Sequence, residues 1–120
     1  MRYGIRWCFQ VAMMPPSGQV DGELESHLDR VMEELLKLET SNETVADPSV
    51  GANFDTGEVE IDLLVEAASV PDALMVGLIY IRTAVHAAGG HTGSWDIGRD
   101  QGGGMVEYGL VNVNAELLPA

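Results

Sequence analysis

Hydrophobic and polar residues alternate along Arg2–Met13, which is the pattern of a strand with one buried face. The apolar side consists of Tyr3, Ile5, Trp7, Phe9 and Val11. Aromatic and β-branched residues at this period favour a strand, and Pro15 and Pro16 end it because proline donates no ladder hydrogen bond. We therefore expect the chain to begin with a strand that packs Trp7 into a core.

Two later segments have the three-and-four spacing of amphipathic helices. The apolar stripe over residues 22–39 consists of Leu24, Leu28, Val31, Leu35 and Leu38. The stripe over residues 70–88 consists of Leu74, Leu78, Ile81, Val85 and Ala88. Asp21 and Ser69 stand where N-caps are expected, and Gly89 and Gly90 end the second helix because glycine adopts the left-handed conformation without strain.

The second predicted helix is apolar on more than one side. Met75, Val76 and Ile79 fall outside its main stripe. Such a helix is usually covered twice, so we expect one side to pack on its own sheet and a second side to meet another surface.

Residues 43–69 have the pattern of a β-hairpin. The turn falls at Phe54–Glu58, where Gly57 can adopt positive φ. Pro48 in the first arm suits an edge strand, and the change of alternation around it predicts a bulge at Asp47–Pro48. The polar side of the second arm consists of Glu58, Glu60, Asp62 and Glu66.

The element order, completed by a last strand over Met105–Asn114, is strand–helix–strand–strand–helix–strand. With right-handed crossovers this order gives an α+β, ferredoxin-like βαββαβ fold, in which a four-stranded antiparallel sheet carries two helices on one face. The first and third strands are then central neighbours and the second is an edge, which suits Pro48. At 120 residues we expect a single domain over residues 1–120.

The sheet face away from the helices is the expected association surface. Its charged residues are predicted to be Arg2, Arg6, Glu58, Glu60 and Asp62. Its apolar residues are predicted to be Cys8, Leu64, Val111 and Val113. Because an open face with apolar residues commonly mediates association, we expect a homodimer or larger homo-oligomer, through this face or through the second side of the later helix.

Composition narrows the range of partners. Nineteen aspartates and glutamates against six lysines and arginines give a formal net charge of −13 at pH 7. Phosphate binding needs clustered cations, so we expect no nucleic acid and no membrane as partner, and a basic protein is the more natural one. Cys8 is the one cysteine, so no intrachain disulfide can form, and the N-terminal residues do not have the pattern of a signal peptide. Both features favour a cytoplasmic protein.

Two segments, VADPSVGANFDTGEVEIDLLVEA and IRTAVHAAGG, resemble parts of small uncharacterised proteins found in actinobacteria. The resemblance covers the predicted hairpin and second helix, and it implies no activity. The element order also resembles that of regulatory ACT-type domains and dimeric α+β barrel enzymes. Ferredoxin-like folds host many unrelated functions, so this likeness brings no functional residues with it.

The glycine-rich segment Val85–Gly104 is the main candidate for chemistry. His86, His91 and Asp96 are spaced by five and five, whereas paired ligands on a helix stand three or four apart, so we predict no metal site. Ser94 is too close to His91 and Asp96 in the chain to resemble a known catalytic triad, and no phosphate-binding glycine motif is present. We predict no catalytic residue and no cofactor.

Trp95 is the residue of this segment that the fold explains least. A tryptophan in a glycine-rich loop either pins the loop to the domain or lines a pocket or interface. The residues expected to bind a ligand or partner are His91, Trp95, Asp96 and Arg99. The sequence thus favours a small non-catalytic domain that self-associates or binds a protein. The alternative is a small-molecule-binding regulatory domain, or a dimeric α+β barrel-type enzyme with the 91–100 loop over a pocket.

Overall fold

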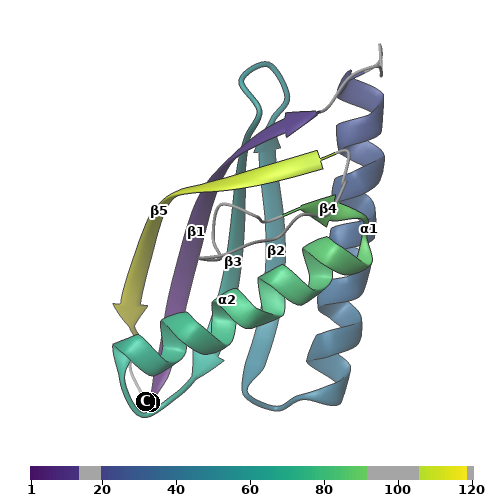
Figure 1. The fold of residues 1–120 in the computed structure, drawn as a ribbon. Coiled ribbons are helices and arrows are strands. Elements are labelled where there is room, and N and C mark those ends of the chain that lie inside the picture. Colours follow the sequence, from purple (N-terminus) through teal and green to yellow (C-terminus); the bar gives the residue numbers. More distant parts are fainter. Residues whose placement is uncertain (14–19, 92–105, 119–120) are drawn as a thin grey trace.

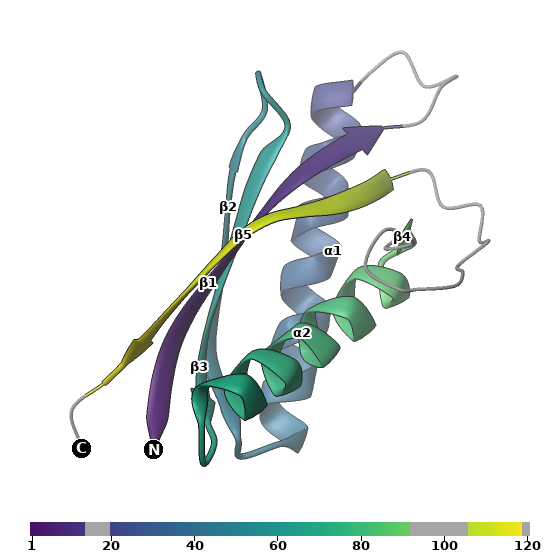
Figure 2. The same cartoon turned by 60° about the vertical axis from the view of Figure 1, so that its left-hand side comes forward.

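A computed structural model describes residues 1–13, 20–91 and 106–118 of the chain. Within these ranges the elements are β1 (Arg2–Met13), α1 (Val20–Ser41), β2 (Val45–Asn53), β3 (Glu58–Glu66), α2 (Val70–Ala87), β4 (Gly90–His91) and β5 (Val106–Leu117). The strands form one sheet in the order β2-β3-β1-β5-β4, and both helices cover the same face of it (Figure 1, Figure 2). The predicted ferredoxin-like arrangement is therefore confirmed.

The described part of the chain adds a fifth, very short strand to the four that the sequence predicts. β4 pairs in parallel with the first residues of β5, Gly90 opposite Val106 and His91 opposite Glu107. The other neighbouring strands are antiparallel. Two residues directly after a helix carry no periodic pattern, which is why the sequence did not reveal this strand.

The core lies between the sheet and the two helices, and Trp7 of β1 is its largest fully buried side chain. A β-carbon placed on Gly77 of α2 would lie 2.2 Å from Cη2 of the Trp7 indole, so only glycine leaves room for the ring at this crossing. The buried side of α2 is accordingly made mostly of small residues. It consists of Ala73, Gly77, Ile81, Ala84 and Val85.

The predicted stripe of α2 is therefore wrong in its first half. Leu74 and Leu78 are only partly buried and flank the contact with the sheet, whereas Ile81, Val85 and Ala88 are buried as predicted. Spacing alone favoured the large leucines, but the bulk of Trp7 brings the glycine side of the helix onto the sheet. Met75 and Ile79 are exposed, as their place outside the stripe predicts.

The α1 stripe is confirmed, since Leu24, Leu28, Val31 and Leu35 are buried. The helix begins at Val20, so Asp21 lies inside it and not at the predicted cap. The α2 cap is as predicted: Ser69 accepts a hydrogen bond from the Asp72 backbone N–H at 3.3 Å. Neither described helix is both long enough and apolar enough to span a membrane.

The predicted bulge in β2 is confirmed. The pairing of β2 with β3 shifts between Ala46 and Ser49, and Asp47 has a φ of 51°. The Asp47 backbone N–H donates to the Glu39 carboxylate at 3.0 Å. The hairpin turn also forms as predicted, because Gly57 has a φ of 79°.

A second bulge changes which side of β5 faces the core. Leu110 pairs with Phe9 and Asn112 with Cys8, so Val111 is the extra residue. Beyond it the alternation reverses, and Val113 lies opposite Trp7 and packs against the core. The prediction that Val113 lies on the open face is therefore wrong, because a uniform period of two cannot anticipate an inserted residue.

Replacing Gly77 with alanine is expected to destabilise the protein. Overpacking a tight core typically costs about 1–3 kcal/mol, which exceeds the gain of about 1 kcal/mol in helix propensity from glycine to alanine. Urea unfolding of the wild type and the variant measures the loss. In a Trp7→Phe background, which removes the ring atoms that contact Gly77, the same substitution is expected to cost less. An equal cost in both backgrounds would contradict the proposed contact.

Candidate functional site

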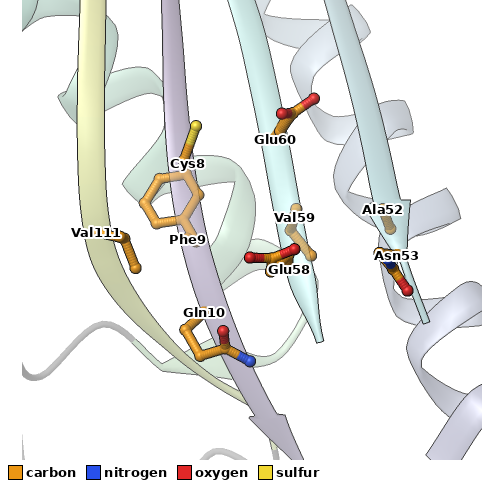
Figure 3. Close-up of a pocket in the computed structure, with 9 residues that line it drawn as sticks. All are labelled: Cys8, Phe9, Gln10, Ala52, Asn53, Glu58, Val59, Glu60 and Val111. Carbon is orange, nitrogen blue, oxygen red and sulfur yellow. The ribbon is translucent and has the colours of Figure 1, made fainter. Parts of the chain in front are cut away.

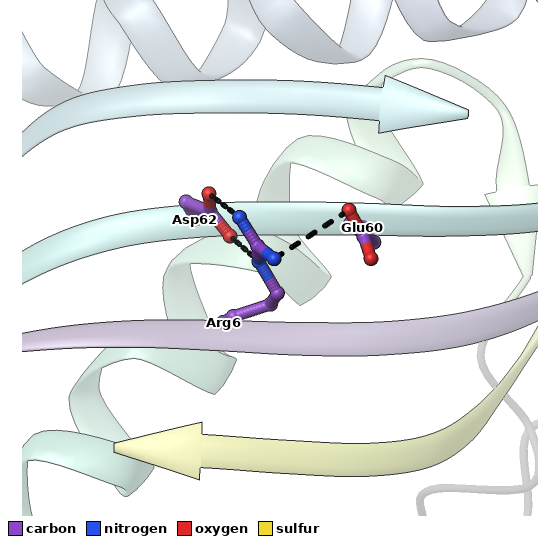
Figure 4. A network of polar contacts seen from close by, with 3 residues as sticks. All are labelled: Arg6, Glu60 and Asp62. Atoms are coloured by element: carbon purple, nitrogen blue, oxygen red, sulfur yellow. Dashed lines mark hydrogen bonds and ion pairs between the residues drawn. The ribbon is translucent and has the colours of Figure 1, made fainter. Parts of the chain in front are cut away.

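Polar residues of β1 and β3 meet on the sheet face away from the helices, here called the outer face. The Arg6 Nε and Nη2 atoms donate to the two Asp62 carboxylate oxygens at 2.9 and 3.0 Å (Figure 4). Arg6 Nη1 lies 3.9 Å from Glu60. The Asp62 hydrogen bonds, together with the carboxylate charges, raise the pKa of Arg6 above its ordinary value. The predicted pairing of arginine with carboxylates on this face is confirmed for Arg6.

The described part of the outer face has shallow hollows. The first, of about 330 Å³, is lined by Cys8, Gln10, Glu58, Glu60 and Val111 among others (Figure 3). Val111, the bulge residue of β5, is 68% exposed there. The second hollow, of about 680 Å³, is lined by Arg6, Asp47, Asp62, Leu64 and Glu116 among others.

The outer face carries more negative than positive side chains. On β3 alone it presents Glu58, Glu60, Asp62 and Glu66, and the Met1 ammonium lies 3.2 Å from Glu66. This arrangement attracts cationic groups and repels anions. In the described residues no group of three or more histidine, cysteine, aspartate or glutamate side chains could hold a metal ion.

The residues predicted to bind a ligand fall almost wholly outside the described ranges. Trp95, Asp96 and Arg99 belong to residues 92–105, which the structure does not describe. The backbone of His91 forms part of β4, but the structure does not describe its side chain. His86 is exposed in the last turn of α2, where a histidine is favoured by the helix dipole. The prediction of a ligand-binding or partner-binding loop stays a prediction.

His27 of α1 is the polar residue that sequence reasoning missed. Its side chain is 1% exposed, and both ring nitrogens have partners. Nδ1 lies 3.2 Å from the Ala88 carbonyl oxygen and Nε2 lies 2.9 Å from the Tyr108 hydroxyl. Because a carbonyl only accepts, Nδ1 carries the hydrogen, and the Tyr108 hydroxyl donates to Nε2. The neutral ring thus has both nitrogens satisfied.

This hydrogen-bonded pair joins three elements that are distant in sequence. His27 connects α1 to the C-terminal end of α2 through Ala88 and to the start of β5 through Tyr108. A β-carbon on Gly90 would lie 3.2 Å from the His27 ring, so β4 also packs closely against it. The sequence contained a signal for this burial. His27 stands three residues after Leu24 and four before Val31, so helical spacing places it on the same side as the apolar stripe.

Burial shifts the acid–base properties of both partners. Desolvation lowers the pKa of His27, and the charge of Arg30 lowers it further, although the Ala88 hydrogen bond opposes the shift. Burial also raises the pKa of Tyr108. The pair is therefore held in its neutral form at neutral pH.

Neither a model of a known protein family nor any curated protein matches this sequence.

The stability of the fold is expected to fall as the pH drops below about 6.5, the ordinary histidine pKa. Because folding lowers the pKa of His27, the unfolded chain takes up a proton there that the folded chain resists. The free energy of unfolding should therefore fall by up to about 1.4 kcal/mol per pH unit. Urea unfolding at several pH values between about 5 and 7 measures this slope.

A His27→Gln variant has no such titration, so its slope should be smaller than that of the wild type. His86→Gln leaves the buried His27 ring in place, so this variant should keep the fall in stability that His27→Gln loses. Equal slopes for the wild type and His27→Gln would show that His27 is not the group responsible.

Proposed function

We propose that this chain is a small interaction domain that associates with a second copy of itself through β5. The main observation that supports this proposal is the exposure of the Leu117 side chain. This residue pairs with the buried Tyr3 and lies on the same side of the sheet, yet it is 58% exposed. An apolar residue on the core side of a sheet is normally covered, so a second surface is expected to cover it.

The position of the helices explains this exposure. α1 packs against β2, and α2 packs against β3 and β1. The C-terminal half of β5 runs clear of both helices (Figure 2). The helix-side residues left there, here called the β5 strip, are Val113, Ala115 and Leu117, of which Val113 is partly buried.

The two edges of the sheet differ in how they are protected against association. Proline, lysine and bulges are common devices that keep an edge strand from pairing with another chain. β2 has a bulge and a buried Pro48, and the Asp47 N–H is already bonded to Glu39. β5 has its own bulge at Val111, but the residues beyond it pair regularly with β1. The strand contains no proline, lysine or arginine, and β4 covers only its first residues. The β5 edge is therefore the better candidate for pairing with a second copy.

Charge disfavours the alternative in which two copies meet through their outer faces. Such a dimer would resemble an α+β barrel and would bring the Glu58, Glu60, Asp62 and Glu66 carboxylates of two chains together. Like charges across an interface cost several kcal/mol in typical cases. Arg6 offsets little of this repulsion, because it is already paired with Asp62.

Antiparallel pairing of two β5 strands about a two-fold axis would cover Leu117 and would keep the two acidic outer faces apart. It would use the edge of β5 that no described strand pairs with beyond β4, and it would bring the two β5 strips side by side. A symmetric contact of this kind is self-complementary, so it closes as a dimer. The formal net charge of −13 supports a basic protein as a further partner.

The proposal predicts a dimer in sedimentation velocity at concentrations of roughly tens of micromolar, where a modest interface is populated. Leu117→Lys and Ala115→Lys place charges in the β5 strip and should shift the protein to monomer.

Met75→Lys, on the exposed side of α2, is the matched control and should leave the dimer intact. A wild-type monomer would contradict the proposal. Dissociation by Met75→Lys but not by Leu117→Lys would place the interface on α2 and would equally overturn it.

A further inference from the structure

A groove between α1 and the second half of β2 lies on the opposite edge of the sheet from β5. It has a volume of about 290 Å³, and its apolar lining residues include Leu28, Met32, Val50 and Phe54. Phe54 is 38% exposed at the turn of the hairpin. Leu36, one turn after Met32, is 46% exposed. The apolar surface therefore continues along α1 beyond the groove.

The backbone beside this groove belongs to an edge strand. β2 is the last strand on its side of the sheet, and in the described part of the chain no strand pairs with its outer edge. The bulge and Pro48 interrupt only the first half of β2, whereas Ser49–Asn53 pair regularly with β3. An extended segment can form hydrogen bonds to such an edge.

The rim of the groove is acidic. Glu25 and Asp29, one helical turn apart on α1, both line it and both are exposed. The described lining includes no lysine, arginine or histidine. An extended peptide that presents apolar and basic side chains would therefore match the groove in both polarity and charge.

We propose that this α1–β2 groove binds an extended basic segment of a partner protein. The segment adds as a strand to the free edge of Ser49–Asn53 and inserts an apolar side chain between Met32 and Val50. Its lysine or arginine side chains pair with Glu25 and Asp29. This inference shares with the proposed function the premise that the domain acts by binding other chains. It does not depend on the β5 contact, because the groove and the β5 strip lie on opposite edges of the sheet.

The probe is a short fluorescein-labelled peptide that alternates lysine and isoleucine, titrated with the full chain and followed by fluorescence anisotropy. We expect saturable binding with a Kd on the order of 100 μM. In ¹⁵N-labelled protein the amide signals that shift should be those of residues 49–54 and 25–32. A peptide with glutamate in place of lysine should not bind. A peptide N-methylated at alternate residues should lose binding, because it cannot complete the hydrogen bonds to β2.

Asp29→Lys is expected to weaken binding about tenfold by removing one rim charge and adding a repulsive one. Glu43→Lys, an exposed position just beyond the C-terminal end of α1, makes the same change in net charge and should alter the Kd by less than about twofold. Equal weakening by both variants would show that only net charge attracts the peptide and would overturn the inference. Amide shifts centred on Cys8 and Glu60 of the outer face would overturn it as well.

The same titration on Leu117→Lys separates this inference from the proposed function. Retained peptide binding by that variant supports a groove independent of β5, and lost binding contradicts it. A wild-type protein that binds the peptide as a monomer would contradict the self-association proposal alone. A dimer that does not bind the peptide would contradict the groove alone.

Discussion

The contact between Trp7 and Gly77 sets the position of α2 on the sheet, and much of the rest of the structure follows from it. The indole occupies the space that any β-carbon at position 77 would need, so the helix can approach only with its glycine side. The larger side chains Leu74 and Leu78 are consequently moved to the flanks, where they are partly buried. Protein interiors are packed as densely as organic crystals, so one large ring and one missing side chain determine which face of a helix is buried.

A second constraint is polar and lies at the other end of α2. His27 is buried and holds the helix end and the start of β5 through Ala88 and Tyr108. A buried histidine is tolerated because both ring nitrogens have partners, and removing either partner would leave a desolvated polar group. This pair also lies beside the described residues that flank the segment 92–105, which are Gly90–His91 and Val106–Tyr108.

The same placement of the helices decides which surfaces remain open. With α1 on β2 and α2 on β3 and β1, the core side of β5 is left bare near Leu117. The groove beside β2 remains open as well, with an apolar floor and the acidic rim formed by Glu25 and Asp29. The two edges therefore differ in chemistry, because the β5 edge exposes an apolar side chain whereas the β2 edge combines apolar residues with carboxylates. The outer face between them is acidic and pairs its central arginine, Arg6, internally.

The sequence by itself determined the order of the two helices and the four long strands, the cap of α2 and the hairpin turn. These depend on local periodicity and on residues such as Ser69, Pro48 and Gly57. It also anticipated the pairing of Arg6 with carboxylates, since alternation places both on one sheet face. Only the tertiary structure decided the buried side of α2, the partners of His27 and the bare side of β5. Each of these depends on residues far apart in the chain, on the volume of a ring or on an inserted bulge residue, and no local pattern contains that information.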